Sequence, residues 1–100
     1  MAKPTYPLTT VQSRVNALGA NAFTASALNS AQNELGLTLQ EMINTINTGR
    51  ESDCFKTMPS IAIPGAFQDV YHLATPFSQI AYVKFCLHIQ SKVVVSFKEK

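Results

Sequence analysis

Charged side chains are few in this sequence. Only 14% of its 100 residues are charged, and eight lysines and arginines against six acidic residues give a formal net charge of +2. This balance permits binding to a polyanion without requiring it. Long apolar runs are absent as well, since none exceeds the four residues from Ile80 to Val83. The sequence therefore predicts neither a membrane-spanning segment nor a signal peptide, and we expect a cytoplasmic protein.

Cysteine, glycine and proline are also scarce. The two cysteines, Cys54 and Cys86, belong to no CxxC pair and have no histidine at metal-ligand spacing, so zinc and a disulfide framework are poorly supported. Free thiols fit better, and no metal or cofactor is expected. Four glycines and five prolines are typical of a folded chain rather than a disordered one. The length then predicts a single domain over residues 1–100.

Three segments in the first half repeat apolar residues at helical spacing. The first opens on Thr9-x-x-Gln12 and the third on Thr38-x-x-Glu41, which is the pattern of a capping box, and Leu37 is placed to form a hydrophobic staple with the third helix. The stripes and the glycines that end them are Val11, Val15, Leu18 and Gly19; Leu28, Ala31, Leu35 and Gly36, after a start near Ser26; and Leu39, Met42, Ile43, Ile46 and Gly49.

From residue 79 onwards the pattern changes to the period of two that is typical of strands. The first strand places Ala81, Val83, Phe85, Leu87 and Ile89 on one face and Ile80, Tyr82, Lys84, Cys86 and His88 on the other. After a tight connection at Gln90–Ser91, the returning strand places Val93, Val95 and Phe97 on its apolar face and Val94, Ser96 and Lys98 on the opposite one. Residues 66–72 form a shorter strand whose buried face the pattern does not decide. Helices followed by strands predict an α+β domain, with the helices packed on one face of a twisted antiparallel sheet formed mainly by the C-terminal half.

The other face of that sheet is the candidate for chemistry. Tyr82, Lys84 and Lys98, with Lys56 from an earlier strand or loop, offer cations for phosphate and a phenol for hydrogen bonding or proton transfer. The sequence has no nucleophilic Ser/His/Asp set, glycine-rich phosphate loop, helical metal motif or close carboxylate pair, which disfavours nucleotide hydrolysis, zinc hydrolysis and glycosidase chemistry. From the residues alone, a surface that binds RNA or phosphate and an ordinary solvated sheet face both remain open.

Several ordered stretches resemble a known family. They are Ser26-Ala27-Leu28, Asn33-Glu34-Leu35-Gly36-Leu37, Glu51-Ser52-Asp53-Cys54-Phe55-Lys56-Thr57-Met58, Phe67-Gln68-Asp69-Val70-Tyr71, Tyr82-Val83-Lys84 and Val95-Ser96-Phe97-Lys98-Glu99-Lys100. In this order and spacing the chain resembles, over essentially its whole length, the motility quorum-sensing regulator toxins, which are bacterial mRNA interferases of toxin–antitoxin modules. The resemblance implies a RelE-like fold and an endoribonuclease that cleaves single-stranded mRNA at short GC-containing sites, without a ribosome or a metal, and so inhibits translation.

The resemblance also implies site residues. The catalytic positions of the family fall on Lys56, Gln68, Tyr82 and Lys98. We expect a ribose 2′-OH to attack the adjacent phosphate, with Tyr82 or Lys56 handling protons, Lys98 and Lys56 stabilising negative charge, and Gln68 orienting the substrate. The assignment of base and acid stays open. The additional candidates for RNA contact are Lys84, Phe67, where relatives commonly carry tryptophan, His72 and His88.

The implied partners are the mRNA substrate and a cognate antitoxin that carries zinc and a DNA-binding module, with operator DNA contacted only through that antitoxin. A non-catalytic module that binds RNA or antitoxin is the alternative, and the presence of all four catalytic residue types argues against it. A DNA-binding regulator built on the helical half is disfavoured, because residues 26–49 contain only Glu34 and Glu41 as charged residues.

Overall fold

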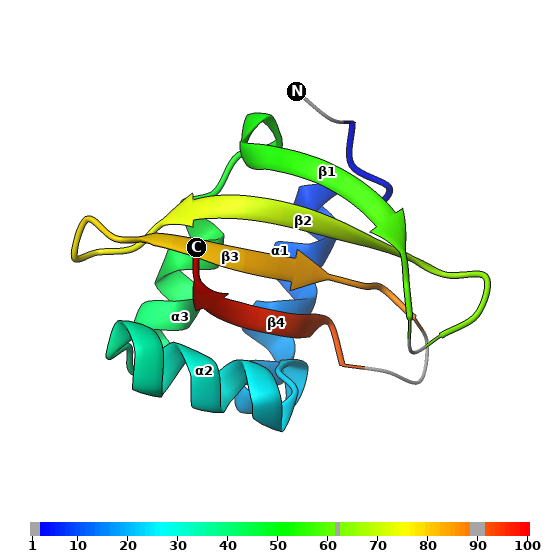
Figure 1. The fold of residues 1–100 in the computed structure, drawn as a ribbon. Helices are drawn as coiled ribbons and strands as arrows, with labels where there is room; N and C mark the ends of the chain where they lie inside the picture. Colours follow the sequence, from blue (N-terminus) through cyan, green and yellow to red (C-terminus); the bar gives the residue numbers. More distant parts are fainter. Residues whose placement is uncertain (1–2, 62, 89–91) are drawn as a thin grey trace.

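The computed structural model describes residues 3–61, 63–88 and 92–100 as a layer of helices against a four-stranded sheet (Figure 1). The elements are α1 (Leu8–Leu18), a 3-10 turn η1 (Gly19–Ala22), α2 (Ala25–Leu35), α3 (Leu39–Asn47), a second 3-10 turn η2 (Glu51–Asp53), β1 (Cys54–Pro59), β2 (Phe67–Ala74), β3 (Ile80–Phe85) and β4 (Val94–Glu99). The strands pair antiparallel in the order β1-β2-β3-β4. The predicted α+β class, with helices on one face of an antiparallel sheet, is confirmed.

The predicted connection at Gln90–Ser91, and Ile89 before it, lie outside the described residues. Within the described residues, no helix has both the length and the apolar character that crossing a membrane would need.

Helix α3 begins as its sequence predicts. The backbone N–H of Glu41 donates to Thr38 Oγ1 at 3.2 Å, and the backbone N–H of Thr38 donates to Glu41 Oε1 at 2.8 Å, which completes the capping box. Just beyond its C-terminal end, Gly49 packs so closely that a Cβ there would lie 2.9 Å from Leu73 Cδ2. The end of α3 is therefore held tightly against β2.

The predicted capping box at the start of α1 is wrong. The N-cap is Pro7, two residues before the predicted cap Thr9, and its side chain makes no capping hydrogen bond; the helix begins at Leu8. The helix N-terminus is instead capped from a distance, because the backbone N–H of Leu8 donates to Glu51 Oε2 at 3.2 Å. Gln12 Nε2 donates to the carbonyl of Ile46 at 2.9 Å and so ties α1 to α3. Leu18, expected in the apolar stripe, is 41% exposed.

Helix α2 lies along the edge strand β4 (Figure 1). Its N-cap is Thr24, two residues before the predicted start at Ser26. Thr24 Oγ1 accepts the backbone N–H of Ala27 at 3.1 Å. The backbone N–H of Thr24 donates to the carbonyl of Val94 at 3.0 Å, and Glu34 Oε1 accepts the backbone N–H of Glu99 at 3.0 Å. These bonds cover the edge of β4 and fix α2 beside it.

The core lies between the helices and the inner face of the sheet. Its largest buried side chains on the strands are Tyr71, Leu73, Val83, Phe85 and Phe97. Near the start of β2, the buried carboxylate of Asp69 accepts the backbone N–H groups of Thr5 and Tyr6 at 2.8 and 2.9 Å. The N-terminal segment is thereby fastened across the end of the sheet.

The long alternation predicted for the third strand breaks at its end. β3 stops at Phe85, and Cys86, which was expected on the outer face, is fully buried, with its backbone N–H bonded to the carbonyl of Val93. The pairing with β4 shifts between Lys84 and Phe85, because Lys84 pairs with Ser96 but Phe85 pairs with Val94. Val95 is therefore an extra, bulged residue.

The bulge also corrects the faces predicted for β4. Val94 is fully buried in the core rather than turned outward, and Val95 is only half-buried. Phe97 is buried and Lys98 is exposed, so the alternation predicted for the rest of the strand is confirmed.

Candidate functional site

One face of the sheet is turned away from the helices, and we call it the outer face. Residues paired directly across antiparallel strands project to the same side, so the register assigns its members. They include Lys56 and Met58 of β1, Gln68, Val70 and His72 of β2, Tyr82 and Lys84 of β3, and Ser96 and Lys98 of β4. The four residues predicted to be catalytic, which come from four different strands, thus lie on one surface.

A bulge in β1 places Lys56 on this surface. Cys54 pairs with Tyr71, whereas Lys56 pairs with the next residue, Val70, so Phe55 is the extra residue in β1. Without the bulge, Cys54 and Lys56 would share a face, and Lys56 would point into the core. The bulge instead brings both Phe55 and Lys56 to the outer face, while Cys54 stays buried.

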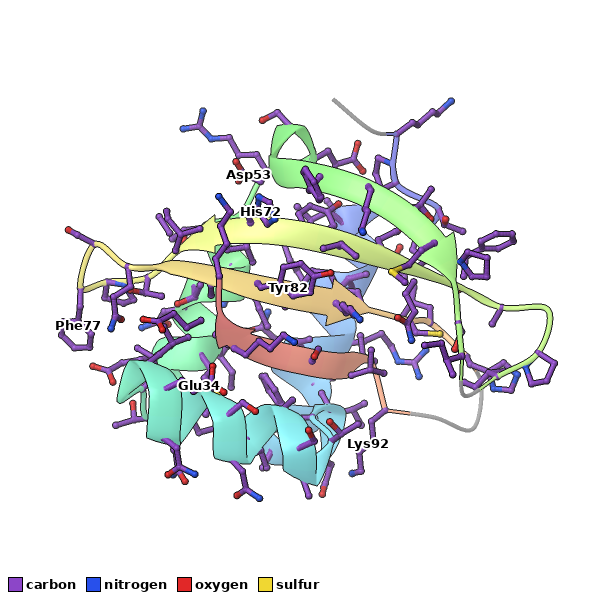
Figure 2. The ribbon with its side chains drawn as sticks, viewed as in Figure 1. Glu34, Asp53, His72, Phe77, Tyr82 and Lys92 are labelled. Carbon is purple, nitrogen blue, oxygen red and sulfur yellow. The ribbon has the colours of Figure 1, made fainter. Side chains whose placement is uncertain are left out.

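Tyr82 lies in the middle of the outer face (Figure 2), and two ammonium groups lie close to its ring. Lys84 Nζ is 5.6 Å from the centroid of the Tyr82 ring, and Lys98 Nζ is 5.4 Å from it. Both distances are in the range of cation–π contacts. Lys98 is directly opposite Tyr82 in β4, and Lys84 lies two residues further along β3. Tyr82 therefore has one lysine on the neighbouring strand and one on its own strand.

An aromatic row leads from the edge of the sheet to Tyr82. The ring of Phe55 stacks on the imidazole of His72, with centroids 4.4 Å apart, and His72 lies 5.8 Å from the ring of Tyr82. Burial of the imidazole and the nearby ammonium group of Lys100 both lower the pKa of His72. Phe55 is 53% exposed.

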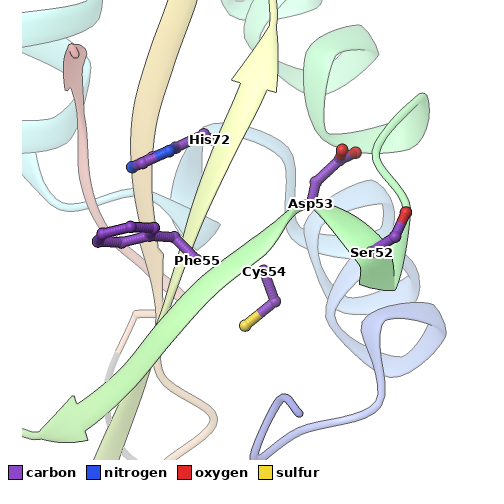
Figure 3. Close-up of a pocket in the computed structure, with 5 residues that line it drawn as sticks. All are labelled: Ser52, Asp53, Cys54, Phe55 and His72. Carbon is purple, nitrogen blue, oxygen red and sulfur yellow. The ribbon is translucent and has the colours of Figure 1, made fainter. Parts of the chain in front are cut away.

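Figure 3 shows Phe55 and His72 side by side at one wall of a shallow pocket of about 420 Å³ that Ser52 and Asp53 also line. Phe55 is not among the site residues predicted from the sequence. Its place depends on the bulge, which nothing in the local pattern signals.

A second, larger pocket of about 470 Å³ opens where β3 ends. Gln68, Lys84 and Ser96 of the outer face line it together with the bulged residue Val95. Gln68 is 9% exposed, and its Nε2 donates to Ser60 Oγ at 3.4 Å. Gln68 therefore lies at the border between this pocket and the sheet, with one long hydrogen bond to Ser60.

The other predicted site residues are more scattered. Lys56 Nζ lies 5.7 Å from the ring centroid of Phe55, and the strand of Lys56 is separated from that of Tyr82 by β2, which corresponds to about 9.5 Å. Phe67 precedes Gln68 at the start of β2, so the alternation turns it to the side opposite Tyr82. His88 is exposed and follows the end of β3. The structure thus brings Lys84 and His72 to Tyr82, but neither Phe67 nor His88.

Both thiols line the pockets beside the outer face, Cys54 the first pocket and Cys86 the second. Cys54 and Cys86 are both buried and free, and burial raises the pKa of Cys54. Within residues 3–61, 63–88 and 92–100, no three His, Cys, Asp or Glu side chains gather in a group suited to holding a metal ion. Among the described residues, the phenol of Tyr82 with its two neighbouring lysines is therefore the best candidate for a reactive group.

Comparison with known proteins identifies the family. Residues 3–99 match the family model described as "Motility quorum-sensing regulator, toxin of MqsA". The chain is also 40% identical over 93 residues to the "mRNA interferase toxin MqsR" of Escherichia coli (strain K12), an alignment that covers 93% of this chain and 91% of that protein. A family match over nearly the whole sequence and a relative of this similarity show that the chain belongs to the motility quorum-sensing regulator toxin family.

Proposed function

We propose that this protein is the toxin of a toxin–antitoxin module and acts as an mRNA interferase, an endoribonuclease that cleaves mRNA and so stops translation. The observation that carries the proposal is the phenol of Tyr82 with Lys84 Nζ and Lys98 Nζ close to its ring on an open sheet face, in a chain similar to a protein named an mRNA interferase toxin. A phosphodiester placed over Tyr82 would meet two cations and a hydrogen-bond donor at once.

The reaction that fits these groups is attack by the neighbouring ribose. The 2′ oxygen forms a bond to phosphorus, the bond from phosphorus to the 5′ oxygen breaks, and the products are a 2′,3′-cyclic phosphate and a 5′-hydroxyl. One proton leaves the 2′-hydroxyl and another is delivered to the 5′ oxygen. Tyr82 and Lys56 divide these two transfers, and Gln68, which bonds to Ser60, orients the substrate.

Positive charge on the outer face would supply the electrostatic part of catalysis. The attack adds negative charge to the phosphate oxygens, and fixed cations placed beforehand stabilise it without reorganisation. Lys98 and Lys56 were expected in this role from the sequence. The distance of Lys84 Nζ from Tyr82, which almost equals that of Lys98 Nζ, supports adding Lys84 to them. Because lysines provide this charge, we propose that cleavage needs no metal.

The substrate is proposed to be single-stranded mRNA, cut at short GC-containing sites without a ribosome. The aromatic row of Phe55, His72 and Tyr82 supports an unpaired strand, because bases in a duplex are not free to stack on side chains. The net charge of +2 predicts modest affinity, so recognition would depend on local contacts.

The experiment that tests this function is cleavage of a long RNA by the purified protein in EDTA. We expect cuts at a few short sites, and their loss in the variants Tyr82→Phe and Lys98→Met. Lys3→Met removes the same charge from an exposed residue near the N-terminus and should cleave as the unmodified protein does. Intact RNA from a folded sample would favour a non-catalytic binding module over an enzyme. Equal cleavage by all variants would show that the active site lies elsewhere.

The family description also points to a partner, because it names these proteins as toxins of MqsA. We propose a cognate antitoxin that carries zinc and a DNA-binding module, through which alone this protein reaches operator DNA. In a gel-shift experiment, the toxin should leave operator DNA unshifted by itself and should alter the mobility of an antitoxin–DNA complex. Tight binding of the toxin alone to the duplex would contradict this proposal.

A further inference from the structure

The pocket at the end of β3 is built by a departure from regular strand geometry. The bulge at Val95 turns this residue away from the core, and Val95 with Ile63 forms an apolar wall. The outer-face residues Gln68, Lys84 and Ser96 line the same cavity of about 470 Å³, which is in the size range of pockets that hold small organic groups. A regular β4 would place Val95 in the core.

Polar groups that line this pocket could form hydrogen bonds to a ligand. Ser60 Oγ accepts the backbone N–H of Ile63 at 3.2 Å and an N–H of Gln68 Nε2 at 3.4 Å, which leaves Gln68 Oε1 free to face the pocket. Among the described residues, neither Gln68 Oε1 nor the hydroxyl of Ser96 takes part in a hydrogen bond. The pocket therefore combines an apolar wall with an acceptor, a hydroxyl and the ammonium group of Lys84.

The pocket is continuous with the proposed site of cleavage. Lys84 lines the pocket and also lies 5.6 Å from the ring of Tyr82. Two residues of a strand span about 6.6 Å, so Tyr82 and the pocket are close to one nucleotide apart along β3. A strand whose phosphate contacts Tyr82 would bring the base of an adjoining nucleotide to the mouth of the pocket.

We infer that this pocket, lined by Gln68, Lys84, Val95 and Ser96, holds one nucleobase of the RNA next to the cleaved bond and so selects the cut site. The inference rests on the proposed endoribonuclease function. The base packs flat against Val95 and Ile63, while its polar edge meets Gln68 Oε1, the Ser96 hydroxyl and Lys84 Nζ. Contacts to phosphate position the RNA strand, and contacts to the base in this pocket provide sequence specificity.

The test uses the intact protein and short RNAs that contain one cut site. Each nucleotide near the cut is replaced in turn by an abasic one, and kcat/KM is measured. We expect one position at which loss of the base lowers kcat/KM by roughly 5- to 100-fold. If no position beside the cut shows such a loss, the inference is wrong.

A matched pair of variants assigns that position to the pocket. Ser96→Thr keeps the hydroxyl, whereas Ser96→Val has the same shape without it. On intact RNA the valine variant should have a kcat/KM about 3- to 10-fold below that of the threonine variant, as expected for one hydrogen bond. On RNA that is abasic at the sensitive position, the two should be equal. An undiminished difference there would mean that Ser96 contacts something other than a base.

A second pair tests the mouth of the pocket. Ile61→Glu puts a negative charge at an exposed residue that lines it, and Phe77→Glu puts the same charge in the distant turn between β2 and β3 (Figure 2). Only Ile61→Glu should raise KM, and equal effects of both would overturn the inference. Tyr82→Phe is measured in the same series. If Tyr82→Phe abolishes cleavage while the pocket variants change nothing, the proposed function holds and the inference about the pocket fails.

Discussion

Lys84 and Lys98 should contribute almost equally to cleavage. Their ammonium nitrogens lie 5.6 and 5.4 Å from the centroid of the Tyr82 ring, and we expect a phosphate bound at Tyr82 to be about equally far from both. A unit charge about 5 Å away interacts with one added negative charge by about 0.8 kcal/mol in a medium like water and about 3 kcal/mol at an effective dielectric constant of 20. Each lysine should therefore accelerate cleavage by roughly 4- to 150-fold.

The assay compares kcat/KM of Lys84→Met and Lys98→Met on one short RNA, with Lys3→Met as the charge control. Both variants should fall within the calculated range and within about threefold of each other, and their deficit should shrink as salt is raised, because exposed charges are screened. Circular dichroism establishes that each variant is folded. If Lys84→Met stayed within twofold of the unmodified protein while Lys98→Met lost more than tenfold, the equivalence of the two lysines would be refuted.

Three further predictions concern stability. Asp69→Asn leaves one of the N–H groups of Thr5 and Tyr6 without its acceptor, so urea unfolding should show a loss of about 2 kcal/mol or more, and an unchanged midpoint would contradict the anchoring role. Ser78 has a φ of 64°, a left-handed conformation that favours glycine, so Ser78→Gly should raise Tm by about 2–4 °C, and a lower Tm would argue against strain there. The lowered pKa of His72 means that protonation favours the unfolded chain, so stability should be complete above the unfolded pKa of about 6.5 and decline as the pH falls below it. His72→Gln should make that decline shallower in urea unfolding at pH 7.5 and 5.5, and an identical decline would exclude His72 as its source.

Local sequence signals predicted the features that depend on near neighbours. Thr38 and Glu41 form the capping box that their spacing indicates, since both bonds lie within one helical turn. The alternation around Tyr82 and Lys84 gave the correct face, and antiparallel pairing correctly brought Lys98 opposite Tyr82. The surface that carries the proposed site was therefore largely predictable.

Features that depend on distant partners were not predictable in this way. Gln12 has the spacing of a capping residue, but its side chain bonds to the carbonyl of Ile46 in another helix, and Glu51 caps α1 instead. The two bulges, at Phe55 and Val95, depend on how neighbouring strands pair. For this reason neither the stacking of Phe55 on His72 nor the pocket beside Lys84 could be predicted from the sequence.

The most direct test of the central claim concerns the nucleophile. A short RNA with a single cut site is compared, in EDTA, with the same RNA carrying one 2′-deoxynucleotide on the 5′ side of the cleaved bond. We expect the all-ribose RNA to be cut to a 2′,3′-cyclic phosphate and a 5′-hydroxyl, Tyr82→Phe to slow this cut greatly, and the deoxy-substituted bond to stay intact. Cleavage of that bond at an undiminished rate, or products with a 5′-phosphate, would show that the 2′-hydroxyl is not the nucleophile.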